Sequence, residues 1–491
     1  MSGVTAETSR SSRHGSEVLG VNHTLRLALA AALTVAAVGA TAASSAPYDA
    51  PTPGIACDKG SLPEKTQGRA PKSDVASGRT ALGYTCNARQ IGHFGGATGG
   101  YRVERYVDKA GHECAYYDSS LLPPTYAVDQ GTETTGTYAM DLSNPAHPVH
   151  TDTLRTAAFQ APHESVRLNQ KRGLLVADMG NPTSSPGIVD VYDVTGDCRH
   201  PALLSSSPLG LLGHESGFSP DGRTFWVSSL GGGTLAAVDL TNPRVPGLVF
   251  YSRDYRPHGL SISNDGNTLY LADTTTGAKG LTILDVSQVQ ARVTNPVVPV
   301  VSRLTWANVS TPQNATPFTS HGHAFVLETD EFGQGASIGA ARIIDVQDRR
   351  HPFVASNLRL AVNSASAQGP DLEADPGNDQ QFQGYQAHYC TLPSRVDPQI
   401  VACSFIMSGL RVFSIAHPTK PREVAYFNKP LLAGKGTDPT QAGAFAMSAP
   451  AYDPATHDIW YSDGNSGFYV VRLTPASGIR SFAGKYVLPG N

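Results

Sequence analysis

Histidines recur at one position in several similar stretches of the chain. Three of these stretches read APHESVRLNQKRGLLVAD, GHESGFSPDGRTFWVSS and PHGLSISNDGNTLYLAD. Their histidines, together with one in a fourth stretch, HYCTLPSRVDPQIVACSF, are His163, His214, His258 and His388. Each stands 15 residues before the residue that ends the next apolar run, namely Asp178, Ser229, Asp273 and Cys403. If these segments meet in space, their imidazoles could share a ligand.

Carboxylates accompany these histidines. Glu164 and Glu215 directly follow the first two, and Asp178 and Asp273 end the paired runs. Imidazole and carboxylate groups on rigid strands suit a divalent metal such as copper, zinc or iron. The predicted metal ligands are therefore His163, His214, His258 and His388, with Glu164 or Glu215 as a further ligand or catalytic base.

Two other roles stay open for the histidines. Each imidazole could hydrogen-bond a neighbouring turn and be purely structural, or the group could bind substrate and transfer protons without a metal. The incomplete pattern favours chemistry, because Ala315 and Ser448 stand at the equivalent offsets in two other stretches. A purely structural histidine would be expected in every copy.

Two further clusters are predicted to be solvated. His321 and His323 in TSHGHAFVLETDEF are spaced to chelate an ion, but we expect them in a turn towards the opposite face, with Glu328, Asp330 and Glu331 nearer the other histidines. The acidic insert DLEADPGNDQQ carries Asp371, Glu373, Asp375 and Asp379. It lacks the glycine placement and closing glutamate of a helix-loop-helix calcium site, so we expect a polar loop there.

The elements that carry these residues form a repeat. The histidine stretches predict two strands each, joined by turns such as SPDG (219–222) and SNDG (263–266). A third strand follows, as in GTYAMDLSNPAHP, TLAAVDLTNPRVP and ARIIDVQDRRHP. The residue that follows its apolar core lies at 141, 193, 239, 285, 345, 414 and 472. Seven copies predict an all-β fold, a seven-bladed β-propeller with four-stranded blades.

Proline-spaced turns after each third strand predict an outer fourth strand, because proline is tolerated at a sheet edge. The last copy has a weak sequel, whereas ARQIGHF (88–94) resembles a fourth strand with no blade before it. We therefore expect this N-terminal strand to close the ring. The predicted propeller spans 81–491, after an irregular segment at 47–80. The first strand of every blade should line the central channel, which brings the histidines to one mouth.

The N-terminus has the features of an export signal. Arginines precede the apolar run LRLALAAALTVAAVGA and small residues follow it, which predicts a cleaved signal peptide at 1–46. A membrane anchor is the alternative, but the run is short and rich in alanine. Export makes the six cysteines disulfide candidates. Cys390 and Cys403 flank the centre of a predicted hairpin and are expected to pair.

The composition and the absence of certain motifs argue against several classes of protein. Only 16% of residues are charged and the net charge is −4, so no basic surface for nucleic acid is expected. After the signal, no apolar run is long enough to span a bilayer. Phosphate loops and dinucleotide fingerprints are absent from the sequence, so no nucleotide cofactor is predicted. The chain also lacks the G-x-S-x-G and H-E-x-x-H motifs.

The repeated third strand, with GLTILDVS (280–287) as its nearest copy, resembles the LVIVD repeat. The segments GYTCN (83–87), GHE (213–215), HYC (388–390) and SGLRVFSIAHPTKPREVAYFN (408–428) resemble parts of secreted actinobacterial proteins of that type. Ser414 and Arg472 depart from the acidic position of the repeat. The resemblance implies an exported β-propeller but no particular activity.

Together these features predict a secreted β-propeller with a histidine-lined, metal-binding site at the mouth of its channel. A metal-dependent oxidoreductase, or a hydrolase or lyase, acting on a small molecule is one interpretation. The alternative is a non-enzymatic scaffold that binds a glycan or peptide at the cell surface or in the medium.

Overall fold

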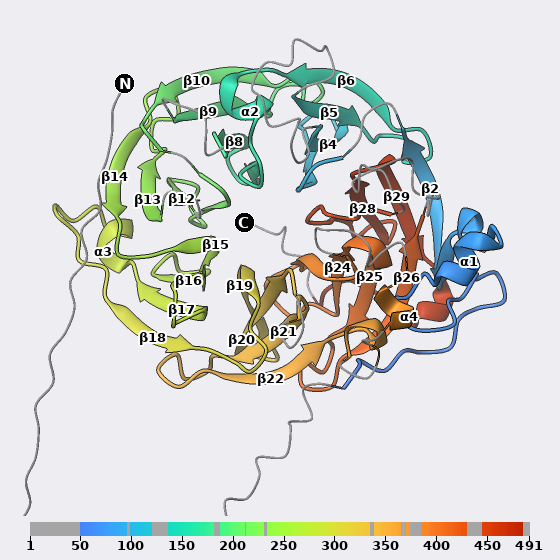
Figure 1. The fold of residues 1–491 in the computed structure, drawn as a ribbon. Coiled ribbons are helices and arrows are strands. Elements are labelled where there is room, and N and C mark those ends of the chain that lie inside the picture. The colour runs from blue at the N-terminus through green and yellow to red at the C-terminus, as the bar shows by residue number, and fades with distance from the viewer. Residues whose placement is uncertain are drawn as a thin grey trace, which may run out of the picture. The chain divides into compact units, whose positions relative to one another are not determined.

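The computed structural model describes residues 50–484 apart from segments at 96–98, 120–135, 181–186, 212, 230–232, 334–337, 365–366, 368–369, 374, 376–383 and 430–443. Seven antiparallel sheets surround a central axis (Figure 1). The predicted seven-bladed β-propeller is confirmed. The predicted signal peptide lies outside the described residues.

Each blade has four sequential strands, apart from the two that the N-terminal strands join. Blade one contains β3 (Glu104–Val107), β4 (Glu113–Asp118), β5 (Thr137–Asp141) and β6 (Val149–Leu154). Blade two contains β7 (Arg167–Asn169), β8 (Leu174–Asp178), β9 (Ile188–Asp193) and β10 (Ala202–Pro208). Blade three contains β11 (Ser216–Phe218), β12 (Thr224–Ser229), β13 (Thr234–Asp239) and β14 (Gly247–Ser252). Blades four and five contain β15 (Pro257–Ile262), β16 (Thr268–Asp273), β17 (Gly280–Asp285), β18 (Val300–Leu304); and β19 (Thr311–Ser320), β20 (His323–Glu331), β21 (Ala341–Asp345), β22 (Phe353–Leu358).

The last two blades recruit strands from the N-terminal region. Blade six contains β23 (Ala387–Thr391), β24 (Ile400–Phe405), β25 (Gly409–Ser414), β26 (Arg422–Asn428) and, beside β26, β1 (Tyr84–Cys86). Blade seven contains β27 (Ala451–Asp453), β28 (Asp458–Asp463), β29 (Gly467–Leu473) and β2 (Ala88–Phe94). The pairing of β2 with β29 confirms the predicted ring closure. The fifth strand of blade six was not predicted, because YTC is too short to stand out as a strand.

Short helices connect or flank the blades. They are α1 (Lys72–Ala76), η1 (Arg79–Leu82), α2 (Ala157–Gln160), α3 (Ser287–Gln290), η2 (Ala361–Asn363), α4 (Pro370–Glu373), η4 (Ile406–Ser408) and η6 (Pro475–Ser477).

Burial explains why the third strand of each blade gives the clearest signal. Strands such as β13 and β17 are buried along most of their length, because both faces pack against neighbouring blades, whereas the residues of the outer strands β10 and β14 are exposed or half-buried. The acidic residue at the end of the third strand caps the turn that follows. Asp239 Oδ1, for example, accepts the backbone N–H of Thr241 at 3.1 Å, an interaction typical of aspartate in turns.

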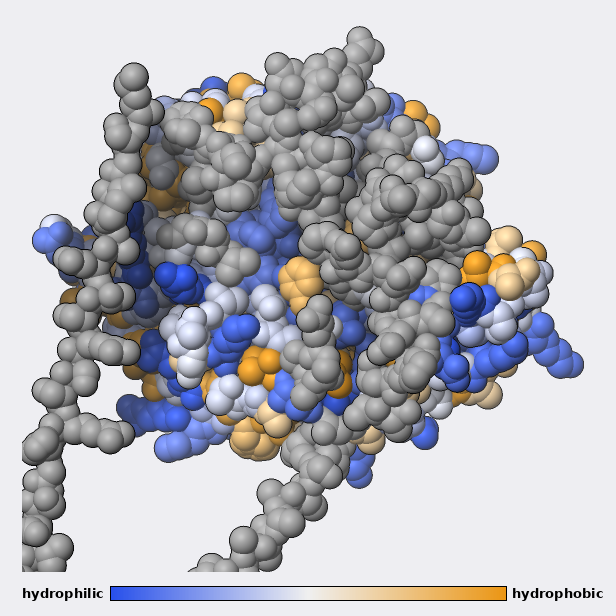
Figure 2. All heavy atoms as spheres, viewed as in Figure 1, coloured by the Kyte–Doolittle hydropathy of each residue, from blue (hydrophilic) through white to orange (hydrophobic). Residues whose placement is uncertain are grey.

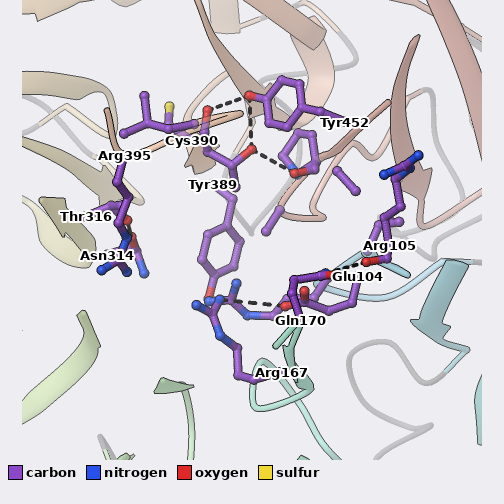
Figure 3. Close-up of a pocket in the computed structure, with 17 residues that line it drawn as sticks. Glu104, Arg105, Arg167, Gln170, Asn314, Thr316, Tyr389, Cys390, Arg395 and Tyr452 are labelled. Atoms are coloured by element: carbon purple, nitrogen blue, oxygen red, sulfur yellow. Dashed lines mark hydrogen bonds and ion pairs between the residues drawn. The ribbon is translucent and has the colours of Figure 1, made fainter. Parts of the chain in front are cut away.

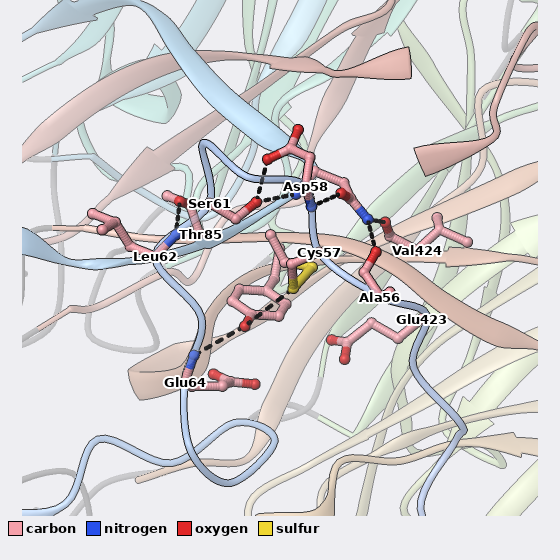
Figure 4. Close-up of a disulfide and its surroundings, with 12 residues drawn as sticks. Ala56, Cys57, Asp58, Ser61, Leu62, Glu64, Thr85, Glu423 and Val424 are labelled. Atoms are coloured by element: carbon pink, nitrogen blue, oxygen red, sulfur yellow. Dashed lines mark hydrogen bonds between the residues drawn. A yellow bond between two sulfur atoms is a disulfide. The ribbon is translucent and has the colours of Figure 1, made fainter. Parts of the chain in front are cut away.

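Three disulfides cross-link the described chain, Cys57–Cys86, Cys114–Cys198 and Cys390–Cys403. The predicted Cys390–Cys403 pair is confirmed, and the two residues are direct partners in the β23–β24 ladder. Cys57–Cys86 ties the segment before the propeller to β1 (Figure 4). Three disulfides fit an extracellular protein.

The segment at 50–83 has little regular structure but packs against blade six. Isolated bridges join Gly54 to Glu423 and Leu62 to Thr85. The backbone N–H of Glu64 donates to the Tyr426 hydroxyl at 3.0 Å (Figure 4). Among the described residues, no helix is long and apolar enough to cross a membrane. Where one face is coloured in Figure 2, hydrophilic and hydrophobic side chains are interspersed.

Candidate metal centre

The four predicted histidines come together at the channel. His163 and His214 lie just before β7 and β11, while His258 and His388 belong to β15 and β23. The ring centroids of His163 and His214 are 4.3 Å apart, and those of His214 and His258 are 4.4 Å apart. His258 Nε2 lies 2.7 Å from His214 Nε2. Imidazoles from four blades thus meet at one point, although their role as metal ligands remains a prediction.

Backbone carbonyls orient two of the imidazoles. His258 Nδ1 donates to the Pro312 carbonyl at 2.9 Å, and His388 Nδ1 donates to the Met447 carbonyl at 2.5 Å. A histidine that donates through Nδ1 presents Nε2 to the centre of the group. This is the outer hydrogen bond that fixes the tautomer and orientation of metal-binding histidines.

Glu164 lies at the centre of the imidazoles. Its carboxylate oxygens are 3.2 Å from His388 Nε2, 3.4 Å from His214 Nε2 and 3.8 Å from His163 Nε2. The Tyr389 hydroxyl donates to Glu164 Oε2 at 2.7 Å, and the Gln313 amide donates to the same oxygen at 2.5 Å. These bonds hold the carboxylate in place, so it faces three of the four Nε2 atoms in a fixed orientation.

A second carboxylate borders the imidazoles from blade five. Glu331, the last residue of β20, lies 3.4 Å from His258 Nε2 and 3.3 Å from His388 Nε2. Atoms bound to one ion at about 2.0–2.2 Å lie roughly 3–3.5 Å from one another. Most of the donor separations in this cluster match that spacing.

The cluster combines neutral and charged imidazoles. Burial lowers the pKa of His163 to about 4 and holds the pKa of His214 well below its usual value. Burial also opposes protonation of His388, but the hydrogen bonds that its imidazole donates to Glu164 and Glu331 outweigh burial and raise that pKa to about 10. Although burial opposes ionisation of Glu164, the surrounding imidazoles, His214 foremost, lower its pKa.

Access to the cluster comes from one side. The side chains of His163 and His214 are 11% and 15% exposed, whereas those of His258 and His388 are 1% exposed. The ring of Tyr101 covers part of the group, with its centroid 4.6 Å from that of His163. A small molecule would therefore approach along the first two histidines.

The second predicted glutamate, Glu215, pairs with residues other than the four histidines. Glu215 Oε1 accepts hydrogen bonds from Arg102 and from the Asn314 amide. Burial raises the pKa of Glu215 to about 7, although Arg102 opposes the rise. Glu164 thus joins the imidazole cluster, whereas Glu215 joins a polar layer beside it, and its catalytic role stays a prediction.

The predicted neighbouring carboxylates have other partners. Asp273 accepts the Thr282 hydroxyl at 2.6 Å and caps the turn at Thr275. Asp178 is buried, and burial raises its pKa well above the usual value. Glu328 and Asp330 both pair with Arg342 rather than with an imidazole. Of the three acidic residues at the end of β20, only Glu331 pairs with a histidine in the described part of the chain.

The histidine pair His321 and His323 and the acidic insert at 371–381 were predicted to be solvated, and their described residues form no metal site. His323 is the first residue of β20 rather than a turn residue, and it lies 2.6 Å from Oδ2 of Asp345 at the end of β21. In the acidic insert, Asp375 pairs with Arg69 at 2.5 Å and so fastens the N-terminal segment. Residues 374 and 376–381 of that insert lie outside the described residues.

A third acidic and histidine group is structural. Asp108, His112 and Asp197 lie close enough to share an ion. Asp108 Oδ1 instead accepts the backbone N–H groups of Ala110 and His112, and Asp197 forms a two-bond pair with Arg199. These contacts hold two turns together beside the disulfide at Cys198.

Sequence reasoning missed the residues that orient the carboxylates. Tyr389, Gln313, Arg102 and Asn314 occupy blade positions that the repeat does not share, so no spacing singled them out. Tyr389 directly follows His388, and in a regular strand two successive side chains point to opposite faces. The β-bulge between Ala387 and Tyr389 shifts that register and brings both side chains to the centre.

No family model and no curated protein matches the sequence. Solved structures share the fold at low identity. Hydrazine synthase from Kuenenia stuttgartiensis is 13% identical, with 77% of this chain and 96% of that chain covered and a TM-score of 0.48. The periplasmic gluconolactonase PpgL from Pseudomonas aeruginosa is 17% identical, with 74% and 93% covered and a TM-score of 0.48. These likenesses concern the fold alone.

Proposed function

We propose that this protein is a secreted metalloenzyme that binds one divalent transition metal ion through His163, His214, His258 and His388 and acts on a small molecule. The supporting observation is the meeting of four imidazoles around Glu164, at separations of 3.2–3.8 Å from three Nε2 atoms. Imidazole-rich sites suit copper, zinc and iron. The repeated third strand also supports membership of the LVIVD-repeat family.

The burial of each residue indicates its role in the proposed site. His258 and His388 are buried and held by backbone carbonyls, so they would anchor the ion. His163 and His214 are partly exposed, so substrate would enter beside them. Glu164 is available to complete the ligand set or to take a proton from a group bound at the site. The ion itself would supply Lewis-acid or redox chemistry: copper or iron would support an oxidoreductase, and zinc would support a hydrolase or lyase.

The metal content of the exported protein tests this proposal. Protein purified without chelator should hold close to one ion per chain by elemental analysis, and His163→Ala/His258→Ala should lose it. The matched control is His351→Ala, since that exposed histidine pairs with Asp348, away from the four predicted ligands. A folded wild-type protein that takes up no copper, zinc or iron would overturn the proposal and favour a binding scaffold.

Metal binding should strengthen with pH. His388 has a pKa of about 10 because Glu164 and Glu331 outweigh burial, so at neutral pH an incoming ion must displace its proton. Loss of one proton makes the apparent affinity rise about tenfold per pH unit. Competition with a chromophoric chelator for Zn²⁺ at pH 6.5, 7.5 and 8.5 measures this slope. A flat profile would show that no proton leaves on binding.

A further inference from the structure

A cavity lies in the channel next to the metal centre, and no histidine lines it. Its volume is about 100 Å³, and its walls come from blades one, two, five, six and seven (Figure 3). This exceeds the roughly 10–15 Å³ that one water needs on the same measure, so a small organic molecule fits. Three buried arginines, Arg102, Arg167 and Arg395, border it.

These arginines differ in how their charge is balanced. Arg102 pairs with Glu215. Arg167 has Glu104 as its nearest carboxylate, at the long distance of 3.9 Å, and its Nε has no hydrogen-bond partner in the described part of the chain. The remaining wall cation, Arg105, pairs with Glu113, and Figure 3 shows its guanidinium directed away from Tyr389.

Arg395 has the least compensation. Its side chain reaches from the loop between β23 and β24 to the Ile262 carbonyl, which accepts from Nη1. Its Nη2 is buried and lacks a hydrogen-bond partner, and no carboxylate pairs with it among residues 50–484 as described. Only 6% of the residue is exposed. A buried charge without a partner is strongly unfavourable, so this arrangement has a large penalty unless an anion joins it.

The surroundings reinforce this interpretation. Burial, and then the positive charge of Arg167, lower the pKa of Arg395 to about 9. Burial and the charge of Arg102 likewise lower the pKa of Arg167. An anion in the cavity beside these two guanidinium groups would relieve both penalties.

Charge and shape narrow the class of anion. When Glu215 is ionised it balances Arg102, and Arg167 faces Glu104, which leaves one uncompensated positive charge, that of Arg395. A guanidinium presents a planar fork that matches a carboxylate. The wall also contains Val103, Leu392 and Ala451, which offer apolar surface to an aliphatic group.

We propose that this cavity is a binding site for a small aliphatic monocarboxylate, held by Arg395 and Arg167. The site is distinct from the metal centre. Tyr389 separates the two, since its hydroxyl donates to Glu164 while its ring packs against Arg102 at 4.8 Å. Carboxylate binding therefore does not require a metal ion.

Calorimetry on metal-free protein in chloride-free buffer tests the proposal with propionate as probe. Propionate should bind saturably, and its neutral isostere propanamide should not. Arg395→Met should weaken propionate binding at least tenfold, and Arg167→Met should weaken it as well. The exposed Arg244→Met is the matched control and should bind as the wild type does.

Arg395→Lys provides a second variant that keeps the charge but lacks the planar fork. It should fold and bind propionate more weakly than the wild type. Circular dichroism establishes that each variant is folded. The proposal is overturned if propionate does not saturate the wild type, if folded Arg395→Met and Arg395→Lys both bind it unchanged, or if sulfate or phosphate binds more tightly than propionate.

Discussion

Glu164→Gln should weaken metal binding at least about 100-fold and abolish any metal-dependent activity. Glu164 contacts the Nε2 atoms of His163, His214 and His388 at 3.2–3.8 Å. Loss of an outer partner of a metal ligand typically lowers affinity by about 10–100-fold. Glutamine keeps the shape of Glu164 but removes its negative charge. Because this carboxylate faces three imidazoles directly, loss of its charge should lower metal affinity by at least the upper end of that range.

The variant should remain folded, because glutamine can still occupy the space between the Tyr389 hydroxyl and the imidazoles. Competition with a chelator measures the dissociation constant for Zn²⁺ and Cu²⁺. Glu328→Gln is the matched control: Glu328 is also a buried glutamate, but it pairs with Arg342 and contacts no described histidine. Equal affinities for the wild type and Glu164→Gln would remove Glu164 from the ligand set.

The repeat carried most of the fold prediction. In five blades the third strand ends in an aspartate that caps the following turn, and the same short phrase recurs without the aspartate in the other two. The ring closure followed from an outer strand that lacked a blade. The histidines were predictable for the same reason. They occupy one position of the repeat, and a propeller brings equivalent positions of different blades to one end of the channel.

Residues outside the repeat could not be placed in this way. Tyr389 joins the site only because a bulge in β23 changes the direction of its side chain. Glu331 is one of three acidic residues at the end of β20. Glu328 and Asp330 pair with Arg342, whereas Glu331 reaches the histidines. Such choices depend on partners from other blades, which spacing along the chain does not reveal.

The segment before the propeller shows the same limit on a larger scale. It was predicted to be irregular, and it has few regular elements, but long-range contacts hold it to blade six. Arg411 in β25 donates to both carboxylate oxygens of Glu64, at 2.8 and 2.7 Å, and lies 3.2 Å from Glu423. More than 300 residues separate Arg411 from Glu64 in the sequence, and neither stands in a motif.

Arg411→Met should lower the free energy of unfolding by about 3–5 kcal/mol, the cost typical of removing one partner from a buried ion pair. The Arg411 side chain is fully buried, and its guanidinium lies 4.5 Å from the centre of the Tyr426 ring. The substitution leaves Glu64 and Glu423 buried without their cation. Urea unfolding measures the loss of stability. The control is Arg422→Met, because Arg422 is exposed and directly precedes Glu423, so this substitution should change the free energy of unfolding little.

The loss should also depend on pH in a defined direction. Burial already raises the pKa of Glu423 to about 7 against the opposing effect of Arg411, and removal of the arginine raises it further. A carboxyl whose pKa is raised on folding stabilises the protein below its unfolded pKa and loses that contribution as the pH rises through the folded value. The difference between Arg411→Met and wild type should therefore shrink as the pH falls from 8 towards 4.5. A difference below about 1 kcal/mol at pH 8, or one that grows on acidification, would show that the buried pair does not fasten the N-terminal segment.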